Sequence, residues 1–91
     1  MALCEKSVTI TNKLGLHARA ATKLAQLCNQ YQAKVTVSLD GKDADASSIM
    51  ALMLLAGSQG KIVNVSATGE DAQNALEAVC QLFTDKFEEE D

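Results

Sequence analysis

Apolar residues alternate with polar ones along several short stretches of the chain, which is the spacing of a strand with one buried face. The alternation predicts four strands, over about residues 4–11, 33–40, 43–46 and 62–67. In the first strand Val8 and Ile10 are expected to face inward, and the second has no interruption in its pattern. The sequence Asp40-Gly41 between the second and third strands is a hairpin turn signal.

Three other segments carry apolar residues at helical spacing. They predict helices from His17 to about residue 29, from Ser47 or Ser48 to about residue 56, and from residues 68–71 onward. Glu70 and Asp71 are expected in the first turn of the last helix, where its dipole favours negative charge. Its buried stripe is predicted to consist of Ala72, Ala75, Leu76, Val79 and Phe83.

The order of these elements predicts one α+β domain over residues 1–91, an antiparallel sheet with its helices on one face. The acidic tail, residues 88–91, is expected to be solvated. The middle helix carries more apolar residues than a short helix on a sheet can bury, so we expect part of it to be exposed as a docking patch. The alternative is that all of these residues belong to the core.

The only histidine of the chain, His17, falls where the first helix begins. Gly15 and Leu16 before it offer no capping oxygen, so the amides of the first turn are expected to be open to an anion. Arg19 adds a guanidinium that suits phosphoryl oxygens, and a neutral imidazole is a nucleophile. We interpret this combination as an imidazole that accepts a phosphoryl group and passes it on. The alternative is a surface or capping histidine.

The distribution of charge supports a phosphate site near His17. The net charge of −4 argues against nucleic acid as a partner, but six of the eight basic residues lie within the first 42 positions. Lys13, Arg19 and Lys23 make the His17 region locally positive, which suits a phosphoryl group and an acidic docking partner. Solvated helix charge is an equally good interpretation of Lys23.

Other features exclude several classes of protein. The three cysteines share no paired spacing and are expected to be reduced thiols, and one histidine with scattered cysteines makes no metal site. No targeting signal or membrane-spanning run is visible, so we expect a cytoplasmic protein with no membrane insertion.

Several motifs in register resemble one known family. Gly15-Leu16-His17-Ala18-Arg19 resembles the active-site signature of HPr, the phosphocarrier of the bacterial phosphoenolpyruvate-dependent phosphotransferase system. The segment 47–50 resembles the family's regulatory serine segment, and residues 57–60 and 67–71 resemble its last loop, strand and helix start. The run 51–55 and the acidic end are similar to NPr, the nitrogen-branch paralogue.

This resemblance implies an open-faced β-sandwich with strand order first, fourth, second, third. It implies that enzyme I donates a phosphoryl group to Nδ1 of His17, that Arg19 and the backbone of residues Ala18, Arg19 and Ala20 stabilise it, and that a histidine of an enzyme IIA-type protein receives it. The protein would then be a phosphotransfer intermediate rather than an enzyme, with no metal and no cofactor. We expect it to be a monomer.

Further implications concern the middle helix. The partner contacts of the family correspond to Ile49, Met50 and Met53, and Ser48 corresponds to the serine that a kinase/phosphorylase modifies in some bacteria. A simple helix cap is the equally good alternative for Ser48. The chain departs from the family at Ala20, where proline is common; alanine supplies one more amide and is expected to preserve the chemistry.

Two other functions remain open from the sequence. The first is an NPr-like regulatory protein, whose phosphorylation state controls partner proteins rather than sugar uptake. The second is a small phosphatase of acylphosphatase type, for which Gly15 and Arg19 give only a partial match.

Overall fold

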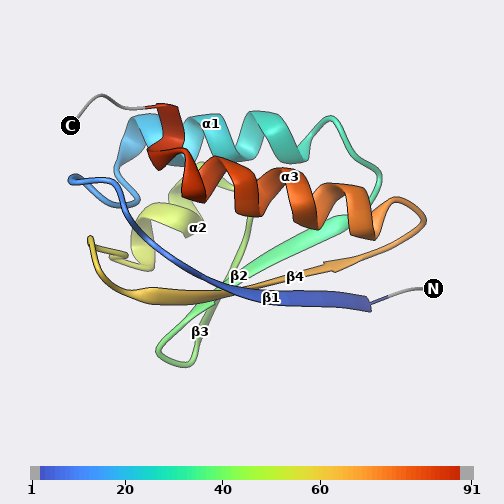
Figure 1. The fold of residues 1–91 in the computed structure, drawn as a ribbon, viewed down its shortest axis with the longest axis horizontal. Coiled ribbons are helices and arrows are strands. Elements are labelled where there is room, and N and C mark those ends of the chain that lie inside the picture. Colours follow the sequence, from blue (N-terminus) through green and yellow to red (C-terminus); the bar gives the residue numbers. More distant parts are fainter. Residues whose placement is uncertain (1–2, 89–91) are drawn as a thin grey trace.

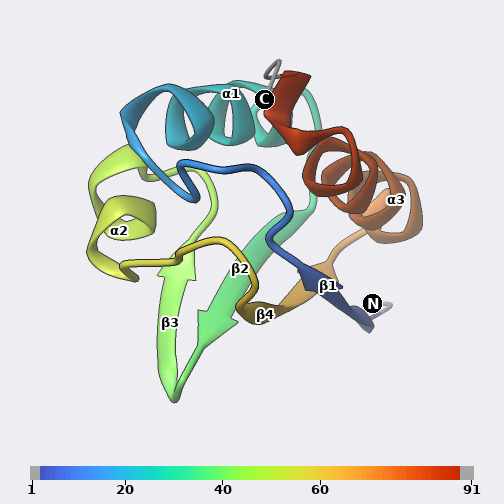
Figure 2. The same ribbon diagram turned by 60° about the vertical axis from the view of Figure 1, so that its left-hand side comes forward.

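The structure, a computed structural model, describes residues 3–88 of the chain. Its elements are β1 (Leu3–Thr9), α1 (Ala18–Cys28), β2 (Lys34–Leu39), β3 (Lys42–Asp45), α2 (Ile49–Leu54), β4 (Ile62–Thr68), α3 (Ala72–Thr84) and a short 3₁₀ turn, η1 (Lys86–Glu88). The strands pair antiparallel in the order β1-β4-β2-β3, and the three helices cover one face of the sheet (Figures 1 and 2). The predicted open-faced α+β sandwich and its strand order are therefore confirmed.

The core lies between the sheet and the helices, and its residues follow the predicted alternation. Val8 lies opposite Val63, and Val65 lies opposite Val37, so these side chains share the face that the helices cover. The predicted stripe of α3 is buried and consists of Ala72, Ala75, Leu76, Val79 and Phe83. Asp40 and Gly41 both have positive φ, 51° and 82°, which is the backbone that a tight two-residue hairpin requires.

The first strand ends earlier than predicted, at Thr9, but Ile10 is fully buried as expected. The Ile10 amide donates to the Lys61 carbonyl, and the Ile10 carbonyl accepts from the Gly60 amide, both at 2.8 Å. Pairing thus continues just beyond the regular ladder, and Ile10 anchors the loop that leads to α1.

The predicted start of the last helix is wrong. Asp71 occupies the N-cap position of α3 and makes no capping hydrogen bond there, and the first turn contains no acidic residue. Its carboxylate instead accepts hydrogen bonds from the amides of Gln32 and Ala33, at 2.9 and 2.7 Å. The loop after α1 therefore uses this carboxylate, because its own amides have no partner in a strand or helix.

The structure describes only Glu88 of the predicted acidic tail, which is exposed, together with the turn that precedes it. Phe87 is fully buried and packs edge-on against Phe83, with ring centroids 4.8 Å apart, and Glu88 is paired with Lys23. Lys86, Phe87 and Glu88 all have positive φ, so this turn is left-handed. Residues 89–91 lie outside the described part of the chain.

The three cysteines differ in burial: Cys28 and Cys80 are buried, and Cys4 is half-buried. Cys4, Cys28 and Cys80 are free. Burial raises the pKa of the Cys28 thiol to about 12, and the negative charge of Asp45 adds to this effect. Within residues 3–88 no cluster of side chains could hold a metal ion, and no helix is long and apolar enough to cross a membrane.

Candidate functional site

His17 occupies the N-cap position of α1. Its backbone is extended, with φ −80° and ψ 179°, and its Nδ1 accepts a hydrogen bond from the Arg19 amide at 3.3 Å. The predicted position at the helix start is confirmed, but the expectation of an uncapped helix is wrong. The histidine itself is the cap, because its ring nitrogen reaches the place that a serine or aspartate oxygen usually takes.

This hydrogen bond defines the state of the ring. A nitrogen that accepts from an amide carries a lone pair, so the proton of the neutral imidazole is on Nε2. The Nδ1 lone pair is therefore directed at the positive end of the α1 dipole. The histidine is half-exposed.

The amides of the first turn are only partly used. The intrahelical ladder begins with the Ala21 amide, which donates to the His17 carbonyl at 2.8 Å, and Arg19 donates to the ring. The amides of Ala18 and Ala20 have no acceptor among residues 3–88. Alanine in place of the family's proline thus provides an additional donor at the mouth of this helix.

The loop before His17 is held by a close backbone approach. Gly15 has φ +67°, and a Cβ atom added to it would lie 2.2 Å from the Gly57 carbonyl oxygen, so only glycine fits. The next residue, Leu16, is buried, and its amide donates to the same oxygen at 2.9 Å. These contacts fix the chain immediately before the histidine.

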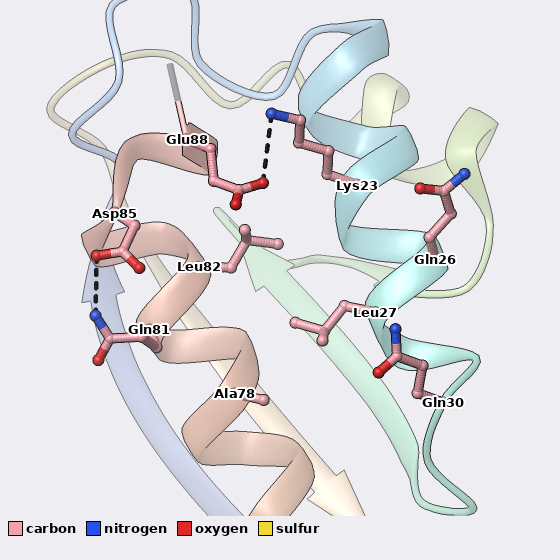
Figure 3. A pocket seen from close by; sticks show the side chains of 9 residues that line it. All are labelled: Lys23, Gln26, Leu27, Gln30, Ala78, Gln81, Leu82, Asp85 and Glu88. Carbon is pink, nitrogen blue, oxygen red and sulfur yellow. Dashed lines mark hydrogen bonds and ion pairs between the residues drawn. The ribbon is translucent and has the colours of Figure 1, made fainter. Parts of the chain in front are cut away.

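The basic residues that the sequence placed near His17 have different surroundings in the structure. Arg19 is exposed and pairs with no carboxylate within residues 3–88. Lys23 is instead directed at the C-terminal turn, where its Nζ donates to the Phe87 carbonyl at 2.8 Å. The same Nζ lies 3.6 Å from a Glu88 carboxylate oxygen (Figure 3). Its charge is engaged there, so Arg19 is the nearer candidate for a phosphoryl partner.

A groove between α1 and α3, of about 320 Å³, is the place where Lys23 and Glu88 meet (Figure 3). Its walls carry the side chains of Gln26, Gln30 and Gln81, and Leu27 and Leu82 lie between them. Neither His17 nor Arg19 lines it. The groove is therefore separate from the candidate phosphoryl site.

The start of α2 distinguishes between its two serines. Ser48 is the N-cap, and its Oγ accepts from the Ala51 amide at 3.2 Å. Ser47 precedes it and donates both its amide and its hydroxyl to Asp45 Oδ1, at 2.9 and 2.7 Å. These hydrogen bonds, from the Ser47 amide first, hold the pKa of Asp45 below its usual value.

The expectation that α2 exposes part of its apolar surface is confirmed. Ile49, Met50 and Met53 have 38%, 75% and 44% of their surface exposed, whereas Leu52 and Leu55 are buried. We call the three exposed residues the α2 patch. Helix α2 packs against α1, the helix that begins at His17 (Figure 2).

Two exposed leucines were missed as candidate contact residues. Leu54 has 74% of its surface exposed and lies one turn after Met50 on α2, and Leu14 is exposed in the loop before Gly15. The signal was present in the sequence. A helical projection places Leu54 beside Met50, and a leucine between Lys13 and Gly15 has no strand or helix to bury it.

Comparison with known proteins identifies this arrangement. A family model described as "PTS HPr component phosphorylation site" matches residues 4–85. The chain belongs to the HPr/NPr family of phosphocarrier proteins.

Relatives within the HPr/NPr family carry both names. The chain is 46% identical over 88 residues to "Phosphocarrier protein HPr" of Xylella fastidiosa, covering 97% of this chain and 99% of the relative. It is also 46% identical over 89 residues to "Phosphocarrier protein NPr" of Shewanella violacea, covering 98% of each. The match favours a phosphotransfer intermediate and gives no support to the small-phosphatase alternative.

Solved HPr structures have the same fold. The HPr of Thermoanaerobacter tengcongensis superposes with a TM-score of 0.91 at 40% identity, covering 96% of this chain and 98% of that one. An HPr from Bacillus anthracis gives 0.85 at 37% identity, covering 89% and 96%.

Proposed function

We propose that the chain carries a phosphoryl group on Nδ1 of His17, which it accepts from enzyme I and passes to a histidine of an enzyme IIA-type protein. The observation that carries this proposal is the direction of the Nδ1 lone pair toward the first turn of α1. A phosphoryl group on that atom would lie at the positive end of a helix.

The transfer can be written from the residues of the site. The Nδ1 lone pair attacks phosphorus, the new N–P bond forms, and the bond between phosphorus and the donor's histidine nitrogen breaks. The proton stays on Nε2 of His17 throughout. Phosphoryl oxygens take hydrogen bonds from the amides of Ala18, Arg19 and Ala20 and from the Arg19 guanidinium, which stabilises their charge as it moves.

In this proposal the chain needs no metal and no cofactor of its own, and it acts in the cytoplasm as a monomer. The α2 patch is the contact surface for enzyme I and for the acceptor, because exposed methionine and isoleucine beside a reactive site suit a protein interface. Neither nucleic acid nor a membrane is a partner.

The proposal is tested with pure protein, enzyme I and phosphoenolpyruvate, followed by ³¹P NMR and mass spectrometry. We expect one phosphate per chain that is labile in acid and stable in base. His17→Ala should accept none. Absence of phosphate on the wild-type chain, with a known HPr as positive control in the same assay, would refute the proposal.

A second candidate is an NPr-like regulatory role, which has the support of a 46% identity to an NPr relative, equal to the identity to an HPr relative. In this case the phosphorylation state of His17 controls a partner that reads the α2 patch. A His17→Ala variant that still binds and regulates its partner, but no longer responds to phosphoenolpyruvate, would favour this role over sugar transport.

We also propose Ser48 as a site for HPr kinase/phosphorylase. Its hydroxyl is at the N-terminus of α2, where a phosphate is favourable within the molecule but adds negative charge to the α2 patch. Incubation with the kinase and ATP should modify Ser48, and Ser48→Ala should abolish that modification; labelling of the variant would exclude the site.

A further inference from the structure

Asn12 is the only polar residue that is fully buried within residues 3–88. It lies in the loop between β1 and α1, five positions before His17. Its side-chain Nδ2 donates to the Gly15 carbonyl at 2.8 Å, and its own carbonyl accepts from the Gly15 amide at 3.3 Å. Both backbone polar groups of Gly15 are thus bound by one residue.

Gly15 is the position at which the chain changes direction. Its φ of +67° is left-handed, and it lies so close to Gly57 that no side chain fits. Glycine is also the residue with the largest choice of backbone conformations, so a contact that fixes its peptide restricts the loop most. Asn12 supplies that contact from the buried side, and the hydrogen bond from Leu16 to Gly57 supplies one from the other side.

The position of His17 depends on Gly15 and Leu16, the two residues that precede it. The histidine is half-exposed, and its capping hydrogen bond to Arg19 is long, at 3.3 Å. The peptides of Gly15 and Leu16 lead directly into His17, so they determine where the histidine Cα lies. A displacement of about 1 Å at a reacting group can lower a rate about a hundredfold.

We propose that Asn12 is a positioning residue for phosphoryl transfer at His17, acting through the Gly15 peptide. Burying the Asn12 side-chain amide has a desolvation cost that an apolar side chain of similar size would avoid. An apolar side chain, however, would leave the buried Gly15 carbonyl without its hydrogen-bond donor. The inference rests on the proposed function, since it concerns the same transfer.

The test is single-turnover transfer from phosphorylated enzyme I, with the chain in varied excess, analysed by rapid quench. The variants are Asn12→Ala and Asn12→Ser; serine keeps a polar group but is too short to reach the Gly15 carbonyl. We expect the transfer rate at saturation to fall about tenfold to a hundredfold, because the ring is misplaced. The half-saturating concentration should not change, because the α2 patch is intact.

Thr11→Val is the matched control. It removes one loop hydrogen bond, from Thr11 Oγ1 to the Phe83 carbonyl at 3.1 Å, and does not touch Gly15. Thermal unfolding identifies temperatures at which every variant is folded. If Asn12→Ala does not fold, the transfer rate of Asn12→Ser is used to test the proposal. A saturating rate for folded Asn12 variants equal to that of Thr11→Val, or a change confined to half-saturation, would overturn the positioning role.

These outcomes are separate from those of the proposed function. If the wild-type chain accepts no phosphate, the carrier role fails, and Asn12 has no transfer to position. If the wild type transfers normally and the Asn12 variants do so too, only the positioning role fails.

Discussion

The Nδ1 atom of His17 caps α1, and the same atom is the proposed phosphoryl acceptor. When phosphorus binds there, the lone pair is no longer available to the Arg19 amide. A phosphoryl oxygen can then accept that hydrogen bond, so the helix end keeps a partner in both states.

A substitution separates capping from phosphoryl transfer. Asparagine is among the best N-cap residues, whereas alanine cannot cap, so His17→Asn should be more stable than His17→Ala by about 1 kcal/mol. Neither variant should accept phosphate from enzyme I. Urea unfolding measures the difference, and equal stabilities of the two variants would show that a side-chain cap at position 17 contributes nothing.

At the scale of elements, α2 has more apolar residues than its position in the fold can bury. It is only six residues long, yet much of its apolar surface is exposed. A short helix over a sheet can bury only one stripe, here Leu52 with Leu55 beyond its end, so the remaining apolar residues face solvent. An exposed apolar surface of this kind is typical of a site that binds another protein.

Met50→Glu tests the role of that surface. Because Met50 is exposed, the free energy of unfolding should change by less than about 0.5 kcal/mol. A buried charge at a contact costs binding energy, so the half-saturating concentration for transfer from enzyme I should rise roughly tenfold. Asn74→Glu, an exposed position on α3, is the matched control and should leave it unchanged; an equal effect of both variants would point to net charge rather than to contact.

The contribution of Asp45, which lies just before α2, to the free energy of unfolding should depend on pH. Hydrogen bonds from the Ser47 amide and hydroxyl lower the pKa of Asp45; desolvation opposes them, and the charge of Lys34 adds a lesser lowering. A carboxyl with a lowered pKa in the folded state stabilises the fold above its unfolded pKa and loses that contribution in acid.

The stability difference between wild type and Asp45→Asn should therefore be largest near neutral pH and should shrink below about pH 4. Urea unfolding between pH 3 and pH 7 measures it. Ser47→Ala removes one of the hydrogen bonds and should weaken the pH dependence. A difference that stays constant over this range would contradict the role of the ionised carboxylate.

At the scale of the whole molecule, the C-terminal turn joins α3 to α1. Phe87 closes the core beside Phe83, and Lys23 of α1 binds the Phe87 carbonyl. Three consecutive non-glycine residues with positive φ are unfavourable locally, so the burial of Phe87 must hold the turn in place.

Phe87→Ala should lower the free energy of unfolding by about 3–5 kcal/mol, since it removes a fully buried ring. Lys23→Met, which keeps the aliphatic stem, should cost only about 1 kcal/mol. Thermal unfolding measures both, with Asn74→Ala as an exposed control. A Phe87→Ala variant as stable as this control would mean that the turn is not part of the folded unit.

The sequence by itself determined the order of the strands and helices, the buried stripes, the hairpin at Asp40-Gly41 and the position of His17 at a helix start. These follow from contacts between residues close in the chain, where the spacing of side chains fixes which face each one occupies. The order of the strands within the sheet, unlike their order along the chain, came from the resemblance to HPr and not from the alternating pattern.

Only the tertiary structure decided which distant groups meet. Asp71 lies 38 positions from Ala33, and Lys23 lies 64 positions from Phe87, so neither hydrogen bond leaves a trace in local periodicity. The same is true of Gly57, whose carbonyl makes Gly15 obligatory. Hydrogen-bond partners such as these are determined by proximity in the folded chain, not by spacing along the sequence.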